Sequence, residues 1–169
     1  MGAFELGDFN TKSEEVAQRP SKVPWPPLLF AAAVFAAFGL KRAYPLAWPG
    51  VDDLAARIVG LSIGAIGIAL IVWAAVTMAR AKTTVLPHKG SSVLVSSGPF
   101  ARFRNPIYLG DAMILLGLAE LTKNIWFVML VPLFIGLVTW LAILPEERHL
   151  EAKFGDAYRD YKAKTRRWV

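Results

Sequence analysis

Long uncharged stretches alternate with short polar connections along this chain. Asp, Glu, Lys and Arg are absent from residues 23–40, 58–79 and 124–145. The last two stretches have the roughly 20 residues that a helix needs to cross the hydrocarbon core of a bilayer. A shorter apolar stretch, 107–121, is interrupted only by Asp111 and Glu120. The pattern predicts about four transmembrane helices, over residues 24–40, 55–79, 106–121 and 124–144.

The two ends of the chain lack this apolar character. Residues 1–22 mix charges with small polar residues, which is typical of a loosely ordered tail. The sequence EERHLEAKFGDAYRDYKAKTRRWV, after Pro145, places apolar side chains near helical spacing among many charges. It predicts a cytoplasmic amphipathic helix over residues 145–164. The expected fold is an all-α membrane protein in which residues 23–169 form a single membrane-embedded domain.

Composition also favours a membrane as the solvent. Of the 169 residues, 55% are hydrophobic, which is more apolar surface than one soluble domain of this length hides in its core. The chain has no cysteine. A disulfide framework and a thiolate metal site are therefore excluded.

Basic residues decide the expected orientation. The formal net charge is +6, and most lysines and arginines fall on the side of the N-terminus when four helices cross the membrane. The other side receives only Lys41, Arg42, Arg57 and Lys123. Positively charged segments stay in the cytoplasm, so both termini are expected there. The basic C-terminal tail then contacts anionic membrane lipids and not nucleic acid.

A face of small residues, Gly60, Gly64 and Gly67, runs along the second predicted helix. Such spacing lets another helix approach closely. That helix belongs either to the same chain or to a second copy, so a homo-oligomer stays open. The long connection over residues 81–105 contains the apolar run VLV and is expected to pack against the helices.

Two polar clusters are expected at the cytoplasmic ends of neighbouring helices. Arg104, Asn105 and Tyr108 lie in the stretch GPFARFRNPIYLG, where the third helix begins, and Glu146 and Glu147 follow the fourth helix. These residues also have ordinary structural explanations. Asparagine is common at a helix N-cap, and the proline that follows it is common in a first helical turn. The charged residues are suited to a membrane surface. Their convergence at one depth predicts a pocket.

The stretch GPFARFRNPIYLG, a helical hairpin and the segment EERHLEAKFGDAYRDYKAKTRRW resemble integral-membrane methyltransferases related to isoprenylcysteine carboxyl methyltransferase and phospholipid methyltransferases. The resemblance covers roughly residues 83–168. It implies S-adenosylmethionine as the cofactor and a lipophilic or small-molecule methyl acceptor. Asn105 stands where the family's commonest motif has a histidine, and an amide does not accept a proton near neutral pH.

The resemblance assigns cofactor contacts to residues from both clusters. They are Asn105, Tyr108, Gly110, Glu146, Glu147 and Leu150. Carboxylates accept hydrogen bonds from ribose hydroxyls, a phenol ring can face a sulfonium cation, and a glycine allows close approach of a ligand. Arg104 in addition suits the carboxylate of the methionyl group.

Methyl transfer from a sulfonium is an in-line displacement, for which a protein mainly orients the reactants and excludes water. A base is needed only for an ammonium or thiol acceptor, and Glu147 is the predicted catalytic residue for that step. Arg166 and Arg167 are predicted to hold an anionic acceptor, with anchoring to the membrane surface as the alternative. No metal site is expected, because the Glu146 and His149 spacing of di-iron bundles is not repeated on a second helix.

Two other functions stay open at this point. A relative of membrane reductases would share the C-terminal hairpin and use NADPH. A non-catalytic membrane subunit would keep the fold in order to dock a partner. Binding of S-adenosylmethionine or of NADPH distinguishes these alternatives.

Overall fold

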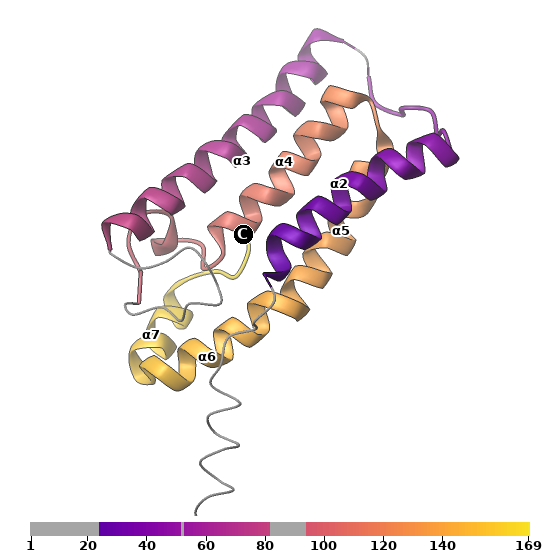
Figure 1. The fold of residues 1–169 in the computed structure, drawn as a ribbon. Coiled ribbons are helices and arrows are strands. Elements are labelled where there is room, and N and C mark those ends of the chain that lie inside the picture. The colour runs from indigo at the N-terminus through magenta and orange to yellow at the C-terminus, as the bar shows by residue number, and fades with distance from the viewer. Residues whose placement is uncertain (1–23, 52, 82–93) are drawn as a thin grey trace, which may run out of the picture.

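Long helices run side by side in a computed structural model of the chain, which describes residues 24–51, 53–81 and 94–169 (Figure 1). In chain order they are α2 (Trp25–Ala43), α3 (Leu54–Arg80), η1 (Gly98–Ala101), α4 (Pro106–Thr122), α5 (Ile125–Val138), η2 (Thr139–Ile143), α6 (Leu144–Phe154) and α7 (Asp156–Lys164). The element η1 is a 3-10 helix and η2 is a π-helical segment that joins α5 to α6. The predicted N-terminal tail, 1–22, lies outside the described residues.

Three helices among the described residues are long and apolar enough to cross a membrane. They are α2, α3 and the continuous helix Ile125–Phe154. Helix α4 is shorter, with 17 residues. The predicted helical fold is confirmed, three of the predicted spans correspond to these candidate membrane-spanning helices, and the number of spans stays a prediction.

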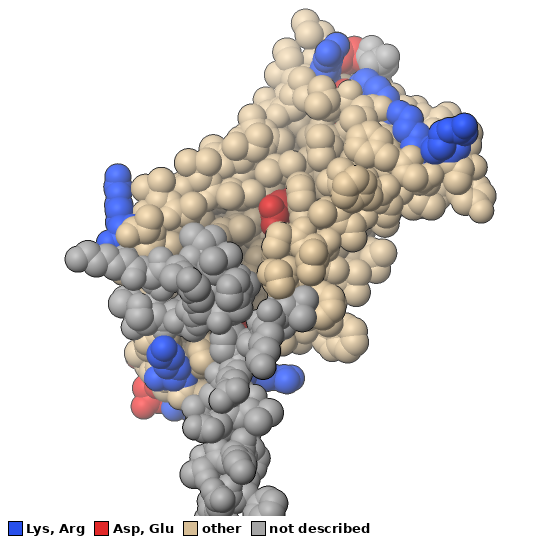
Figure 2. Space-filling view, in the orientation of Figure 1, with Lys and Arg blue, Asp and Glu red and all other residues tan. Residues whose placement is uncertain are grey.

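The outward face of α3 is apolar along much of its length. Ile58, Ile66 and Trp73 of α3 are more than half exposed. Figure 2 shows Lys and Arg gathered at the two ends of the molecule, with a belt of other residues between them. One acidic side chain interrupts these uncharged residues in the view, and exposed apolar residues such as those of α3 are typical of a surface that faces lipid. The belt, together with the three long apolar helices, supports membrane association.

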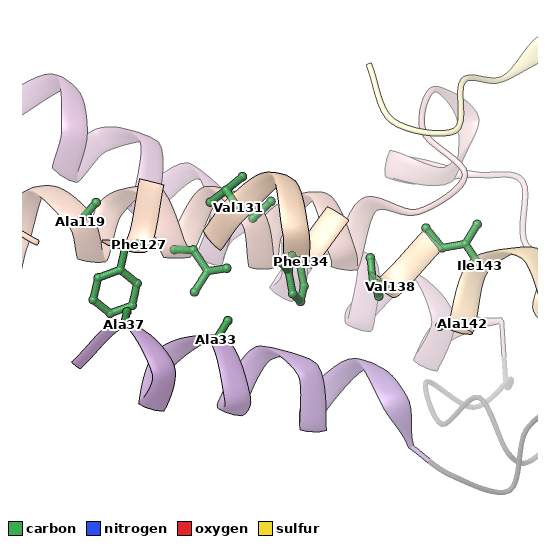
Figure 3. Close-up of a cluster of buried hydrophobic side chains, with 11 residues drawn as sticks. Ala33, Ala37, Ala119, Phe127, Val131, Phe134, Val138, Ala142 and Ile143 are labelled. Carbon is green, nitrogen blue, oxygen red and sulfur yellow. The ribbon is translucent and has the colours of Figure 1, made fainter. Parts of the chain in front are cut away.

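Helices α2, α4 and α5 enclose the apolar core (Figure 3). Phe127 of α5 is fully buried and meets the ring of Phe38 edge to face, with 5.4 Å between the ring centroids. The α2 residues Ala33 and Ala37 lie in the same core. These small side chains let α2 pack closely against the aromatic rings of α5.

Glycines on both helices allow α3 and α4 to approach closely. A Cβ atom at Gly64 would lie 3.1 Å from the Cα atom of Gly117, and one at Gly67 would lie 2.7 Å from the carbonyl oxygen of Gly110. The small-residue face of α3 is therefore occupied by α4 of the same chain. This face is not available to a second copy.

We expect Gly67→Ala to lower the free energy of unfolding in detergent by about 1–3 kcal/mol, because an overpacked contact forces neighbouring groups to move. Gly39→Ala is the matched control, since a Cβ atom at Gly39 of α2 has nothing within 4 Å. The control should be neutral or stabilising by roughly 0.5–1 kcal/mol. Equal stabilities of the two variants would contradict the close α3–α4 contact.

The described part of the predicted connection packs as expected, because a Cβ atom at Gly98 of η1 would lie 2.7 Å from Oγ1 of Thr77 on α3. Residues 82–93 of this connection lie outside the described residues.

The C-terminal segment differs from the single helix predicted over residues 145–164. Gly155 adopts φ +54° and separates α6 from α7. The prediction was wrong at this point because apolar spacing continues across Gly155 while the backbone turns there. The turn buries Tyr158, which is 1% exposed. It directs the end of the chain back toward the start of α4 (Figure 1).

Candidate functional site

Backbone hydrogen bonds join the segment before α4 to the C-terminal segment. The N–H of Arg104 donates to the carbonyl of Arg166 at 2.8 Å, and the N–H of Arg166 donates to the carbonyl of Arg102 at 3.1 Å. Phe103 and Arg166 form a parallel bridge between the two segments. The C-terminal residues therefore form part of the surface around the first turn of α4.

Pro106 occupies the first turn of α4, as predicted, and Asn105 stands at the N-cap position. The side chain of Asn105 makes no capping hydrogen bond. Its Nδ2 group donates instead to the carbonyl oxygen of Arg167 at 3.1 Å. The predicted side-chain cap is therefore wrong, and Asn105 helps to hold the C-terminal segment.

Glu147 lies at the centre of a buried ionic cluster. Arg167 approaches its carboxylate with two nitrogens, Nε to Oε1 at 3.0 Å and Nη2 to Oε2 at 2.7 Å. Nε of Arg104 donates to Oε1 at 3.4 Å. The side chains of Arg104 and Glu147 are only 10% and 8% exposed. Two guanidinium groups thus compensate one buried carboxylate.

Arg104 also binds the C-terminal backbone directly. Its Nη1 group donates to the carbonyl oxygens of Lys162 at 2.9 Å and of Thr165 at 2.6 Å. The predicted contact of Arg104 with a methionyl carboxylate is disfavoured by these hydrogen bonds. The geometry gives this arginine a role in joining α4, α6 and the C-terminal segment.

The same cluster argues against the predicted role of Glu147 as a base. Proton uptake by Glu147 would leave the buried Arg104 and the partly exposed Arg167 without their counter-charge. Arg167 makes two hydrogen bonds to this carboxylate, and they raise the pKa of its guanidinium above the usual value, although burial acts in the opposite direction. These hydrogen bonds give Arg167 a structural role at Glu147, and binding of an anionic acceptor by Arg166 and Arg167 stays a prediction.

Tyr108 and Glu146 bring the two helix ends together. The hydroxyl of Tyr108 on α4 donates to Oε2 of Glu146 on α6 at 3.4 Å. Ion pairs within the described part of the chain form at Glu147 and not at Glu146. Two adjacent glutamates thus have different surroundings, and Glu146 keeps a carboxylate whose described partner is a phenol.

Gly110 and Leu150 complete the predicted cofactor contacts. A Cβ atom at Gly110 would lie 2.5 Å from Cγ1 of Ile71 and 2.7 Å from the carbonyl oxygen of Gly67, both on α3. Gly110 therefore serves helix packing, which the sequence did not distinguish from ligand contact. Leu150 is half-buried on α6, one turn beyond Glu146. Its contact with a cofactor stays a prediction.

Sequence reasoning considered His149 only as a metal ligand. Both of its ring nitrogens are buried, and neither has a hydrogen-bond partner among the described residues. His149 stands three residues after Glu146 on α6, so the two side chains are neighbours on the helix surface. A buried polar group without a partner calls for an explanation such as a ligand.

A hydrogen bond joins helix α7 to η1, which precedes α4 in the chain. The hydroxyl of Tyr161 donates to the carbonyl oxygen of Phe100 at 2.8 Å. Burial raises the pKa of the Tyr161 phenol to about 12, and the charge of Arg104 acts in the opposite direction. Burial likewise raises the pKa of Tyr158. Both phenols therefore keep their protons at neutral pH, and Tyr161 remains a hydrogen-bond donor.

These helices and this ionic cluster define a helical membrane protein whose polar site lies where α4, α6 and the C-terminal segment meet. The chain belongs to the phospholipid methyltransferase family, which matches residues 55–157. The predicted relationship to integral-membrane methyltransferases is thereby confirmed. An uncharacterized protein of Haemophilus influenzae is 41% identical over 63 residues, which are 37% of this chain and 100% of that protein. No solved structure matches the chain.

Proposed function

We propose that this protein transfers a methyl group from S-adenosylmethionine to a lipophilic acceptor at the interface between membrane and cytosol. Membership of the phospholipid methyltransferase family supports methyl transfer in general. The observation that carries the proposal is the contact between Tyr108 of α4 and Glu146 of α6, next to the ion-paired Glu147. Such a pair suits a cationic ligand.

The chemistry of the site fits a sulfonium cofactor. An aromatic ring attracts a cation through its face, and a carboxylate without an arginine partner supplies the opposite charge. When bound, S-adenosylmethionine supplies an activated methyl group.

The ionic cluster positions this site and does not itself react. Arg104 and Arg167 hold Glu147 of α6 against the start of α4 and the C-terminal segment. This fixes Glu146 opposite Tyr108. Holding donor and acceptor in line is the main contribution that a protein makes to a displacement of this type.

The family name supports the amine of a phospholipid headgroup as the acceptor. The apolar outer faces of the helices suit an acceptor that arrives from the bilayer, and membrane lipids are the natural partners of such a surface. At neutral pH such an amine is an ammonium, so it must lose a proton before it accepts a methyl group.

In the proposed topology the chain crosses the membrane four times and both termini lie in the cytoplasm. Helix α4, with 17 residues, is about 25 Å long, slightly less than the roughly 30 Å of a hydrocarbon core. Tyr108 in its first turn then lies near the headgroup boundary. The excess of lysine and arginine on the side of the N-terminus supports this orientation.

Transfer of a labelled methyl group tests the proposal. Purified full-length protein in vesicles of phosphatidylethanolamine is expected to move label from S-adenosylmethionine into lipid and to form S-adenosylhomocysteine in equal amount. Protein-free vesicles give the background. Absence of label in any lipid, together with NADPH consumption, would favour a reductase relative instead.

A further inference from the structure

The buried imidazole of His149 is the most unusual polar group in the described part of the chain. Neutral imidazole carries one donor and one acceptor nitrogen, and in this site neither has a described partner. The residue lies on α6, whose first turn carries Glu146 and Glu147. A displacement of three residues along a helix is about 4.5 Å. His149 is therefore next to Glu146 on the side away from the membrane-crossing helix α5.

Three other polar side chains at this site are unsuited to accept a proton from a substrate. Glu147 is held by Arg104 and Arg167. Asn105 carries an amide, which does not titrate near neutral pH. The phenol of Tyr108 already donates to Glu146. Glu146 accepts this hydrogen bond, whereas the imidazole of His149 has no described partner and has the chemistry of a general base.

We propose that His149 is a catalytic residue that removes the proton of an ammonium acceptor. The inference rests on the proposed methyl transfer and adds to it the group that prepares the acceptor. Glu146, three residues earlier on α6, supplies negative charge beside it.

The step balances in atoms and charge. An unprotonated ring nitrogen of His149 takes one proton of the ammonium, and the electron pair of that N–H bond becomes the lone pair of the amine. This pair forms the new N–C bond while the C–S bond of S-adenosylmethionine breaks. The electron pair of the broken bond stays on sulfur, which becomes a neutral thioether. The proton remains on His149, and the methylated nitrogen carries the second positive charge.

His149→Ala tests this role in the full-length protein in phosphatidylethanolamine vesicles. General-base catalysis contributes about 10²–10⁴-fold, so we expect kcat to fall at least about 100-fold while affinity for S-adenosylmethionine is kept. Added imidazole should restore rate in proportion to its concentration. His149→Gln should be equally slow without such rescue. Arg148→Gln is the matched control, because Arg148 is the exposed neighbour on the same helix.

Each result decides the matter. A His149→Ala protein with the wild-type rate, or a slow one that imidazole does not restore, overturns the proton role while methyl transfer stands. Loss of donor binding in both His149 variants also overturns it, because His149 would then hold the methyl donor. A wild type that binds the donor and methylates only a farnesylcysteine carboxylate, or no acceptor, overturns it as well. A wild type that does not bind S-adenosylmethionine removes the proposed function itself.

Discussion

Glu147→Ala is expected to lower the free energy of unfolding by about 3–5 kcal/mol, the usual cost of removing one partner from a buried ion pair. The variant would leave Arg104, whose side chain is 10% exposed, without the carboxylate that compensates its charge. Arg167 is 36% exposed, which places the expected loss near the lower end of the range. Reversible unfolding in detergent measures it.

Asp156→Ala provides the control for this experiment. Asp156 pairs with Arg159, but its side chain is 93% exposed. Exposed pairs contribute about 0–1 kcal/mol, so this variant should unfold almost like the wild type. A Glu147→Ala protein as stable as Asp156→Ala would show that the cluster does not hold α6 to the start of α4.

Glu146→Gln is expected to weaken binding of S-adenosylmethionine by roughly 10–100-fold. The change keeps the size of the side chain and an oxygen for the hydroxyl of Tyr108, but it removes the negative charge. Interactions with a charged partner contribute about 1.5–3 kcal/mol, and each 1.4 kcal/mol is tenfold in affinity. Calorimetric titration of the purified variant measures the change.

S-adenosylhomocysteine distinguishes a charge effect from a general disturbance of the site. This product lacks the positive charge on sulfur, so Glu146→Gln should weaken its binding much less than that of the methyl donor. An equal loss for both ligands would contradict a role of Glu146 opposite the sulfonium. Unchanged binding of both would place the ligand elsewhere.

The long helices were predictable because each depends on a run of apolar residues that are consecutive in the sequence. An uncharged run of about 20 residues has few other uses, and α3 observed at Leu54–Arg80 closely follows the predicted 55–79. The turn at Gly155 was not predictable from spacing. Apolar residues continue in helical register on both sides of it, and only the positive φ of the glycine reveals the break.

Partners distant in sequence decided the parts of the site that the sequence did not resolve. Asparagine is a common residue at helix N-caps. The side chain of Asn105 nevertheless donates to a carbonyl oxygen 62 residues further along the chain. Glu146 and Glu147 are chemically identical neighbours. A rotation of about 100° per helical residue directs one toward Tyr108 and the other toward two arginines. Such a difference exists only after the helices have packed.

The same is true of the glycines. Gly110 was expected beside a ligand and is in fact pressed against Ile71 and Gly67 of α3. Its sequence context is equally compatible with both uses. The close contact with α3 shows that Gly110 serves helix packing.

The most direct test of a methyl-donor site between α4 and α6 is calorimetric titration of the purified wild type with S-adenosylmethionine and, separately, with NADPH. We expect saturable binding of S-adenosylmethionine that is strongly weakened in Tyr108→Ala and in Glu146→Ala, and no binding of NADPH. Arg159→Gln, a change on the exposed side of α7, should bind like the wild type. A folded wild type that binds NADPH and not S-adenosylmethionine, or variants that bind the methyl donor unchanged, would contradict this site.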